Sequence, residues 1–586
     1  MWSTKYDQVV YCMTLLCGIL IFFWWRTRNK AKAQIVLDLP DKLIILGLML
    51  VYGALSFVNL GELKNYSSWN GNKLGDHFVL KLTKPEPLSK IYYYLGYGTG
   101  NMAVEYTTES GWSDRERFAN DNENFNYAAY HWEAINIVTK DKITALEFMV
   151  DSNDPIELKQ LAIYNSAGKR ITDFQVADSD KDLTELFSMP VPEHKENMAS
   201  NAFLDEYFYG LTAYQYLHDI QPYAWAHPQL ALLFITLGVL FFGASPFGWR
   251  FFPNLTGILL VGVIYLFAKR LFGSRRWAIV ASLLLIFDFM HFSFTRTASL
   301  DAFTALFVTL EYYFLYDYFC KRNNSHASSQ AWRSLLWCGL LFGLAISTKW
   351  VALYSILTLA PIVIYGELIL NKSDGLFKKM CWSLSLLVFV PLLIYGIVYL
   401  PFYRLAQDQS FIGFILRYQQ EMFSFHTTGK IGATHPFNSP WWSWPLNLKP
   451  DEVWFGSAAN SSTASAISLM GNPLIWFGGL VAILFATWQG VMQKKSLALF
   501  LSLSGLSLYL PWILMGHYTF IYYFYIAIPI WILALTYLLS IVYSNGGKFG
   551  VYFYLLIVAA LFVIYYPDIS GIEFARNYVL NHLRFY

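Results

Sequence analysis

Long apolar runs alternate with short polar stretches along most of this 586-residue chain. About 20 apolar residues are needed to cross the hydrocarbon core of a bilayer as a helix. The runs that approach or reach this length lie at residues 9–25, 42–60, 251–268, 277–291, 300–319, 334–347, 350–370, 380–401, 471–490, 496–513, 519–543 and 550–566. The pattern therefore predicts a polytopic α-helical membrane protein with about twelve spanning helices, the first two of them within residues 1–60.

Residues 61–200 have a different pattern. The stretches KIYYYLGYG, ALEFMVDS and LKQLAIYNSAGKRI alternate apolar and polar positions, which is typical of half-buried strands. The segment is polar overall and shows no sustained helical period. It predicts a β-sandwich domain, which would serve either as a structural cap or as a carbohydrate-binding jelly roll.

Basic residues indicate the orientation of the helices. RTRNKAK follows the first apolar run and KRLFGSRR follows the run at 251–268, and Lys and Arg in short loops mark the cytoplasmic side. Both loops face inward only if the short apolar stretch at 228–243 lies along the outer surface as a juxtamembrane helix. The β-domain is then outside. The remaining units are an outer loop with this juxtamembrane helix at 201–250, spanning helices at 251–401, an outer loop at 402–470, and C-terminal spanning helices with an outer tail at 471–586.

Composition agrees with a membrane location. The chain is 56% hydrophobic and 14% charged, against about a quarter charged in soluble proteins. Its net charge of +2 gives no reason to expect a nucleic-acid partner. The cysteines all fall within apolar runs, so neither a disulfide framework nor a cysteine metal site is expected; they are Cys12, Cys17, Cys320, Cys338 and Cys381.

Two adjacent carboxylates in NAFLDEYFYG, Asp205 and Glu206, lie in the predicted outer loop. A carboxylate can take a proton from an acceptor hydroxyl while its neighbour orients the substrate. The pair is therefore a candidate for catalysis, and an exposed loop charge is the simpler alternative.

Three cations fall near the same predicted face: Arg250, Arg296 and Lys349. Guanidinium and ammonium groups bind phosphate oxygens, guanidinium in a bidentate way, so these residues are candidate phosphate ligands. The alternatives are that Arg250 is an interfacial anchor and that Arg296 pairs with Asp301 to hold two helices together.

Other polar and aromatic residues of the predicted outer turns are candidates for substrate binding. Tryptophan and proline at the density seen in THPFNSPWWSWPLNLKP suit a membrane interface and also a surface on which sugar rings stack. No histidine spacing fits a metal site, so no metal is expected. The candidates are His227, His291, Asp301, His426, His435, Trp441, Trp442 and His517.

In their order along the chain, these motifs resemble one known family. DEYFYGLTAYQYL, FGASPFGWRFFPNLTG, FDFMHFSFTRTASLDAF, STKW and HTTGKIGATHPFNSPWWSWPL together look like the protein O-mannosyltransferases, glycosyltransferase family 39 of the GT-C fold. The chain is most similar to bacterial members from Gram-positive organisms, which carry an extra N-terminal helix and a discoidin-like β-domain. The resemblance covers about residues 40–570 and implies about eleven core spanning helices plus the extra one.

The resemblance also implies a reaction. The family takes a sugar from a polyprenyl-phosphate carrier at the outer membrane face and passes it, with inversion, to a protein Ser or Thr hydroxyl. It implies that Asp205 is the general base, that Glu206 contacts sugar or acceptor, and that Arg250 binds the carrier phosphate. No cofactor is implied, because the lipid-linked hexose is itself a substrate.

The chain departs from the family pattern at two places. HPQLAL stands where relatives have His-Pro-Pro-Leu-Gly-Lys, so Gln229, Ala231 and Leu232 replace Pro, Gly and Lys. His517 stands before Tyr-Thr-Phe where many relatives have Arg before Thr-Phe. Two cations are thus weakened or lost.

Other functions remain open at this stage. The acceptor could be a cell-wall polymer or a glycolipid instead of a protein, or the chain could bind glycan without turnover. A transporter is disfavoured, because its ionisable groups would line a path at the bilayer midplane. The expected partners are a polyprenyl-phosphate sugar, an acceptor and the lipid bilayer of the cell membrane; the residues do not indicate an oligomeric state.

Overall fold

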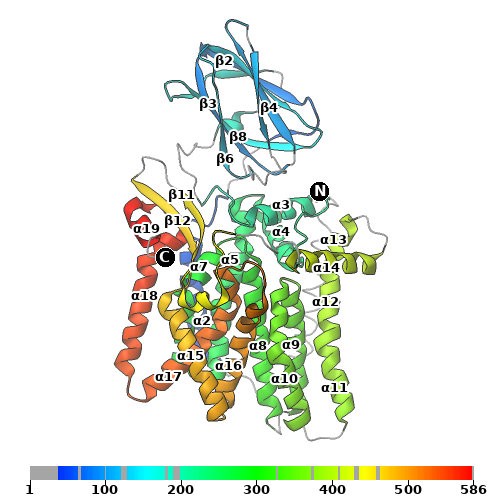
Figure 1. Ribbon diagram of the computed structural model, residues 1–586, viewed down its shortest axis with the longest axis vertical. Helices are drawn as coiled ribbons and strands as arrows, with labels where there is room; N and C mark the ends of the chain where they lie inside the picture. The colour runs from blue at the N-terminus through cyan, green and yellow to red at the C-terminus, as the bar shows by residue number, and fades with distance from the viewer. Residues whose placement is uncertain are drawn as a thin grey trace.

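The computed structural model describes residues 37–63, 68–98, 100–111, 113–119, 129–177, 183–188, 198–324, 328–370, 375–406, 410–427, 435–456 and 462–583. The first predicted helix, 9–25, and the basic segment after it lie outside the described residues. The described chain forms a helical bundle with a β-domain above one end (Figure 1).

The bundle contains every predicted span from the run at 42–60 onward. In the part of the chain that is described, eight helical segments are long and apolar enough to cross a membrane, or nine if the bent pair α6 and α7 is one span. The helices α8 and α9 run beside them (Figure 1). The prediction of a polytopic helical protein is therefore confirmed. The bundle elements are α2 (Leu39–Ser56), α5 (Pro246–Phe272), α6 (Arg275–Ile286), α7 (Phe289–Thr295), α8 (Leu300–Arg322), α9 (Ala331–Ile346), η4 (Trp350–Ser355), α10 (Ile356–Tyr365), η5 (Gly366–Leu370), α11 (Leu376–Leu384), η6 (Ser385–Phe389), α12 (Val390–Val398), α15 (Pro473–Met492), α16 (Ser496–Tyr509), η8 (Leu510–Leu514), η9 (Ile521–Ala527), α17 (Ile528–Ser544) and α18 (Lys548–Ser570).

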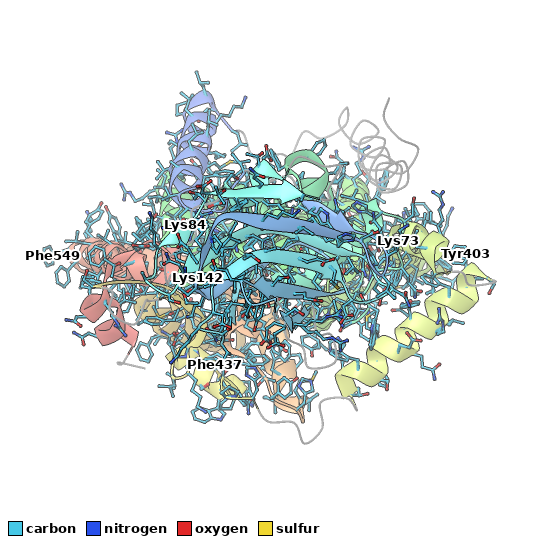
Figure 2. All side chains as sticks on the ribbon, turned by 90° about the horizontal axis from the view of Figure 1, so that it is seen from above. Lys73, Lys84, Lys142, Tyr403, Phe437 and Phe549 are labelled. Carbon is cyan, nitrogen blue, oxygen red and sulfur yellow. The ribbon has the colours of Figure 1, made fainter. Side chains whose placement is uncertain are left out.

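The outer helices expose apolar side chains, as helices in contact with lipid do. On α18, Phe549 is 82% exposed and Val563 is 71% exposed, and on α12 Leu393 is 61% exposed. Seen from above, Phe549 and Tyr403 lie at opposite edges of the molecule, with the β-domain over the middle (Figure 2). In water such a surface would be an aggregation liability; in a bilayer it is the expected lipid-facing surface.

Charged residues pair at the end of the bundle away from the β-domain. Asp41, at the start of α2, is 1% exposed and accepts bonds from Lys269 and Arg275. Lys269 lies in the last turn of α5, which is 27 residues long and so about 40 Å from end to end. The basic cluster KRLFGSRR, which predicted the cytoplasmic side, therefore lies at the end of the bundle away from the β-domain.

The β-domain is a two-sheet structure with one shared core, so the predicted β-sandwich is confirmed. One sheet has the order β1-β8-β3-β6 with β9 beside β8, and the other has the order β10-β2-β7-β4-β5, with neighbours antiparallel. Phe78, Phe148 and Leu161 are among the fully buried residues between the sheets. The strands are β1 (Trp69–Gly71), β2 (His77–Glu86), β3 (Leu88–Leu95), β4 (Asn101–Thr108), β5 (Ser113–Ala119), β6 (Trp132–Asn136), β7 (Ile143–Val150), β8 (Ile156–Asn165), β9 (Arg170–Ile171) and β10 (Phe174–Ala177), followed by η2 (Thr184–Phe187).

Short elements form a layer between the β-domain and the bundle. Within it α4, at 13 residues, is too short to span a bilayer, as predicted for the stretch at 228–243. The predicted outer loop at 402–470 contains more structure than expected, namely an amphipathic helix, a short helix and a β-hairpin that β13 extends to three strands. The elements of the layer are α3 (Glu206–Leu217), α4 (Leu230–Phe242), α13 (Leu400–Leu405), α14 (Phe411–Thr427), η7 (Trp441–Leu446), β11 (Asp451–Gly456), β12 (Thr463–Leu469), β13 (Phe574–Ala575) and α19 (Arg576–Leu583).

Aromatic residues of the β-domain pack directly on this layer. Tyr97 contacts the rings of Tyr214 and Trp249, and the Tyr130 hydroxyl donates to the Ala244 carbonyl at 2.9 Å. A Cβ atom at Gly210 of α3 would overlap the Tyr97 hydroxyl oxygen. The β-domain is therefore seated tightly on the helix that begins at Glu206.

Candidate active site

Asp205 lies on a strained turn at the start of α3. The preceding residue, Leu204, has a φ of +52°, in the left-handed region that non-glycine residues seldom adopt. Asp205 is the N-cap of α3 but makes no side-chain capping bond, and its side chain is exposed. The Tyr209 hydroxyl, one turn along the helix, donates to its carboxylate at 3.3 Å. The predicted base is thus held at the surface of the layer, where it can reach a substrate.

Glu206, in contrast, is 1% exposed. Its carboxylate accepts from the backbone N–H of Ala298 at 2.9 Å and of Phe203 at 3.3 Å, and it forms a bidentate ion pair with Arg250 at 2.8 and 2.6 Å. Sequence reasoning placed Glu206 against sugar or acceptor. The geometry gives it internal partners on both oxygens, so it fixes the turn that presents Asp205.

Arg250 is fully buried and uses all its donors within the protein. Besides Glu206, its guanidinium binds the carbonyl oxygens of Leu60, Met198 and Asn201 at 2.9, 2.6 and 2.6 Å. An arginine has five N–H donors, and these contacts occupy all five. The structure therefore leaves Arg250 no donor for the phosphate that the sequence assigned to it, and it is buried inside the protein.

A second charged pair lies at the start of α8. Lys349 donates to both carboxylate oxygens of Asp301 at 2.8 and 3.0 Å, and its ammonium lies 5.4 Å from the ring centroid of Tyr523. Ser299 caps α8 by accepting from the Asp301 backbone N–H. Lys349 is 14% exposed, so it is the least enclosed of the three predicted phosphate ligands. The pairing also corrects the alternative of an Arg296–Asp301 bridge.

Asp205 and the Asp301–Lys349 pair lie close enough for their charges to act on the same tyrosines. The hydroxyl of Tyr522 lies within electrostatic range of Asp205, Asp301 and Asp451. Burial, followed by the charges of Asp205 and Asp301, raises the pKa of Tyr209 well above its ordinary value. The structure therefore places Asp205, Asp301 and Lys349 in one neighbourhood.

Asp451 is a member of this cluster that sequence reasoning missed. It begins β11 and is 3% exposed. Burial, and next the charge of Asp205, raises the pKa of its carboxyl group to about 7. Its position depends on a hairpin within a segment that was expected to be a loop.

Arg296 lies elsewhere, at the ends of two helices. It is fully buried and donates to the carbonyl of Ser56 at the end of α2 at 3.0 Å and to that of Ser570 at the end of α18 at 2.9 Å. Further bonds reach Val58 and Asn59. Arg296 therefore links the C-termini of α2 and α18, where the helix dipole favours a positive charge.

His291 also lies away from the cluster. It was expected in a short outer turn, but it lies within α7 and is fully buried. Its ring stacks on Tyr52, with centroids 4.9 Å apart, and Nδ1 is 2.9 Å from the Tyr525 hydroxyl. It therefore belongs to the packed interior of the bundle.

The structure brings His227 and His426 together although they are 199 positions apart. Their ring centroids are 5.2 Å apart, and Nε2 of His426 is 2.8 Å from the Ala226 carbonyl. Gln229, which departs from the family pattern, is fully buried and donates to the carbonyls of Ala224 and His227. It stabilises this loop, so the departure has a structural role.

The remaining candidates lie on the outer layer. His435 packs edge-on against Phe520 at 4.8 Å, and Nδ1 of His517 is 2.7 Å from the Tyr518 carbonyl. Trp442 is 54% exposed, whereas Trp441 packs on Tyr509. Across the ranges that the structure describes, no group of three or more His, Cys, Asp or Glu residues could hold a metal ion.

Comparison with known proteins identifies the family. Residues 192–405 match the family model described as dolichyl-phosphate-mannose-protein mannosyltransferase, and residues 411–584 match the model of the C-terminal four-helix region of protein O-mannosyltransferases. The two matches together cover more than half of the chain.

Individual relatives agree with the family matches. A polyprenol-phosphate-mannose–protein mannosyltransferase of Mycolicibacterium smegmatis is 24% identical over 443 residues, 65% of this chain and 86% of the relative. The protein of the same name from Corynebacterium glutamicum is 25% identical over 409 residues, 59% of this chain and 78% of the relative.

A solved structure supports the fold. The Saccharomyces cerevisiae protein O-mannosyltransferase Pmt1-Pmt2 complex bound to its sugar donor superimposes with a TM-score of 0.54 at 14% identity, covering 63% of this chain and 86% of that one. With the family matches and the exposed Asp205 beside the Asp301–Lys349 pair, the chain belongs to the protein O-mannosyltransferase family of GT-C glycosyltransferases.

Proposed function

We propose that this enzyme transfers mannose from polyprenyl-phosphate mannose to Ser or Thr hydroxyls of proteins, with inversion, at the outer face of the cell membrane. The observation that carries the proposal is the exposed carboxylate of Asp205 on its strained turn, with a buried ion pair behind it. The donor and acceptor are those in the names of the mycobacterial and corynebacterial relatives.

In the proposed reaction Asp205 acts as the general base. The acceptor hydroxyl loses its proton to Asp205 while its oxygen attacks the anomeric carbon. The bond from that carbon to the carrier phosphate breaks, and polyprenyl phosphate leaves from the opposite face. A single displacement of this kind inverts the anomeric configuration, and the sugar needs no covalent attachment to the protein.

The departing phosphate needs a cation near it. The donors of Arg250 and Arg296 are engaged in internal hydrogen bonds. We therefore assign the role of phosphate cation to Lys349, whose ammonium group donates to Asp301 and lies near the rings of Tyr522 and Tyr523 in η9. An ammonium has three donors, and two contacts with Asp301 leave capacity for a phosphate oxygen. Glu206, Arg250 and Arg296 position the site without touching substrate.

The orientation of the site is proposed from charge. Asp205 lies at the β-domain end of the bundle, whereas the paired basic residues Lys269, Arg275 and Arg322 lie at or near the other helix ends. Basic residues mark the cytoplasmic side. Asp205 would therefore face outward, where exported proteins are available.

The test is turnover by the purified protein in nanodiscs. Given polyprenyl-phosphate mannose and a Ser/Thr-rich peptide, the wild type should release polyprenyl phosphate and mannosylate the peptide. Asp205→Asn keeps the shape of the side chain but removes its basicity, and should lower kcat by roughly 100-fold or more while the protein stays folded. Full activity in Asp205→Asn would reject Asp205 as the base. Release of carrier with a wall polymer but not with any peptide would assign a different acceptor.

A further inference from the structure

Asp451 is an acidic residue that is almost entirely enclosed by the outer layer. It is 3% exposed and lies at the base of the β11–β12 hairpin. Enclosing an ionised carboxylate in the protein is costly unless it is paired. Such a group in a native structure calls for a reason beyond packing.

The hairpin that carries Asp451 packs against the segment leading into Asp205. The rings of Trp454 in β11 and Phe203 are stacked with centroids 6.3 Å apart, and both belong to a buried cluster with Met198 and Ile467. Phe203 lies two residues before Asp205 and also under the Arg250 guanidinium, at 4.5 Å. The contact places the base of the hairpin against the segment that carries Asp205, and the charge of Asp205 acts on the carboxyl group of Asp451.

We propose that Asp451 acts through Asp205: the two carboxyl groups form a pair that holds one proton below neutral pH, and ionisation of Asp451 makes Asp205 the stronger base. This inference rests on the proposed function. It gives the hairpin, which the bundle does not need for spanning the membrane, a place in the reaction.

The physical reason is repulsion between like charges. When two carboxylates lie close together, ionising the second is disfavoured, and the two apparent pKa values belong to the pair. With Asp451 ionised, a proton arriving on Asp205 from the acceptor hydroxyl relieves this repulsion. The proton then leaves to solvent, and the atoms balance as in the reaction above.

Other charged and titratable groups face the pair. Glu452 is next to Asp451 on β11, and its charge further raises the pKa of Asp451. Asp301 is compensated by Lys349, so that pair adds little net charge. The groups around the two carboxyls are Glu452 from β11, Tyr209 from α3, Asp301 from α8, Lys349 from the start of η4, and Tyr522 and Tyr523 from η9.

The experiment is the pH dependence of kcat/KM in wild type, Asp451→Asn and Glu452→Gln. Wild-type activity should rise as the pH increases through about 7, where Asp451 ionises. Asp451→Asn should lack this rise, equalling wild type near pH 6 and being roughly threefold to tenfold slower near pH 8. Glu452→Gln is the matched control: it removes a neighbouring charge but leaves the pair, so it should keep the rise and only move it to lower pH.

A second measurement does not depend on turnover. In an infrared pH titration, the spectrum of Asp451→Asn is subtracted from that of the wild type. The difference should show the band of a protonated carboxyl group, and this band should disappear near neutral pH. In Asp205→Asn the same band should disappear at lower pH, because the neighbouring negative charge is gone.

The outcomes separate the two proposals. An unchanged pH profile in Asp451→Asn, or an equal loss at every pH, would overturn the pairing, since a purely structural role predicts one or the other. If wild type does not turn over, the proposed function fails, and the infrared titration still decides the pair. A band unaffected by Asp205→Asn would overturn it.

Discussion

The predicted phosphate ligands divide by how completely the protein surrounds them. Arg250 and Arg296 are fully buried and bind backbone carbonyls far away in the sequence, whereas Lys349 binds one carboxylate and is partly exposed. Arginine suits such ties because its planar fork satisfies several acceptors at once. The role of a charged residue at a helix end is thus ambiguous in the sequence until its partners are known.

Replacing Arg250 by alanine tests this division. The change leaves Glu206 buried without its ion partner, and breaking a buried pair costs about 3–5 kcal/mol. Thermal unfolding in detergent should show a large loss of stability for Arg250→Ala. Lys349→Ala is the matched variant: the Lys349 side chain is 14% exposed and its pair with Asp301 is less enclosed than that of Arg250 with Glu206, so it should lose less stability than Arg250→Ala but turn over slowly.

The opposite pattern would restore the role assigned from sequence. If Arg250→Ala unfolds like wild type and only raises the KM for the lipid donor, Arg250 binds phosphate in the working enzyme. The internal bonds seen here would then be those of a resting arrangement.

The sequence predicted the location of some candidate site residues but not of others. It placed Asp205 in an outer loop and brought Asp301 and Lys349 to the same face, because each lies at a helix end or a turn that the apolar runs reveal. It did not predict the burial of Arg296, whose acceptors Ser56 and Ser570 are 240 and 274 positions away. Contacts over such separations leave no periodic signal.

At the scale of elements, the hairpin β11–β12 was the main feature not predicted. Its strands have six and seven residues, and its third strand, β13, comes from residues 574 and 575 beyond α18. The segment around it, rich in Trp and Pro, favoured an irregular loop. Because the hairpin was missed, Asp451 was missed with it.

The seating of the β-domain on α3 gives a prediction at this scale. A methyl group at Gly210 would overlap the Tyr97 hydroxyl, which has no hydrogen-bond partner among the described atoms. Gly210→Ala should therefore loosen the contact between the β-domain and α3. Because Asp205 is at the start of the same helix, its position should shift and activity should fall. Tyr97→Phe alone removes only an unpartnered hydroxyl and should be close to neutral.

Combining the two changes provides the decisive comparison. Tyr97→Phe removes the overlapping oxygen, so the double variant should recover much of the activity and protease resistance lost in Gly210→Ala. Limited proteolysis of the β-domain, followed over time, measures the seating directly. Equal damage in the single and double variants would mean that the overlap is not the cause.

At the scale of the whole molecule, hydrophobic periodicity predicted the architecture well. Every apolar run within the described ranges became a helical segment, and the polar segment 61–200 became a separate β-domain. A helix that crosses a lipid bilayer must be apolar along its length. The spanning helices can therefore be read from the apolar runs of the sequence. Orientation rests on the basic loops alone and can be tested by labelling.

Cysteine labelling would locate the two ends of the molecule. In a variant whose native cysteines are replaced, Val138→Cys introduces a thiol at an 81% exposed position of the β-domain. Asn545→Cys introduces one in the exposed turn between α17 and α18. A membrane-impermeant maleimide should label the first in intact cells and the second only after permeabilisation, because the turn is next to Lys548 at the basic end. The reverse result would place Asp205 in the cytoplasm, where exported acceptors are not folded or displayed, and the proposed reaction could not occur at the outer face.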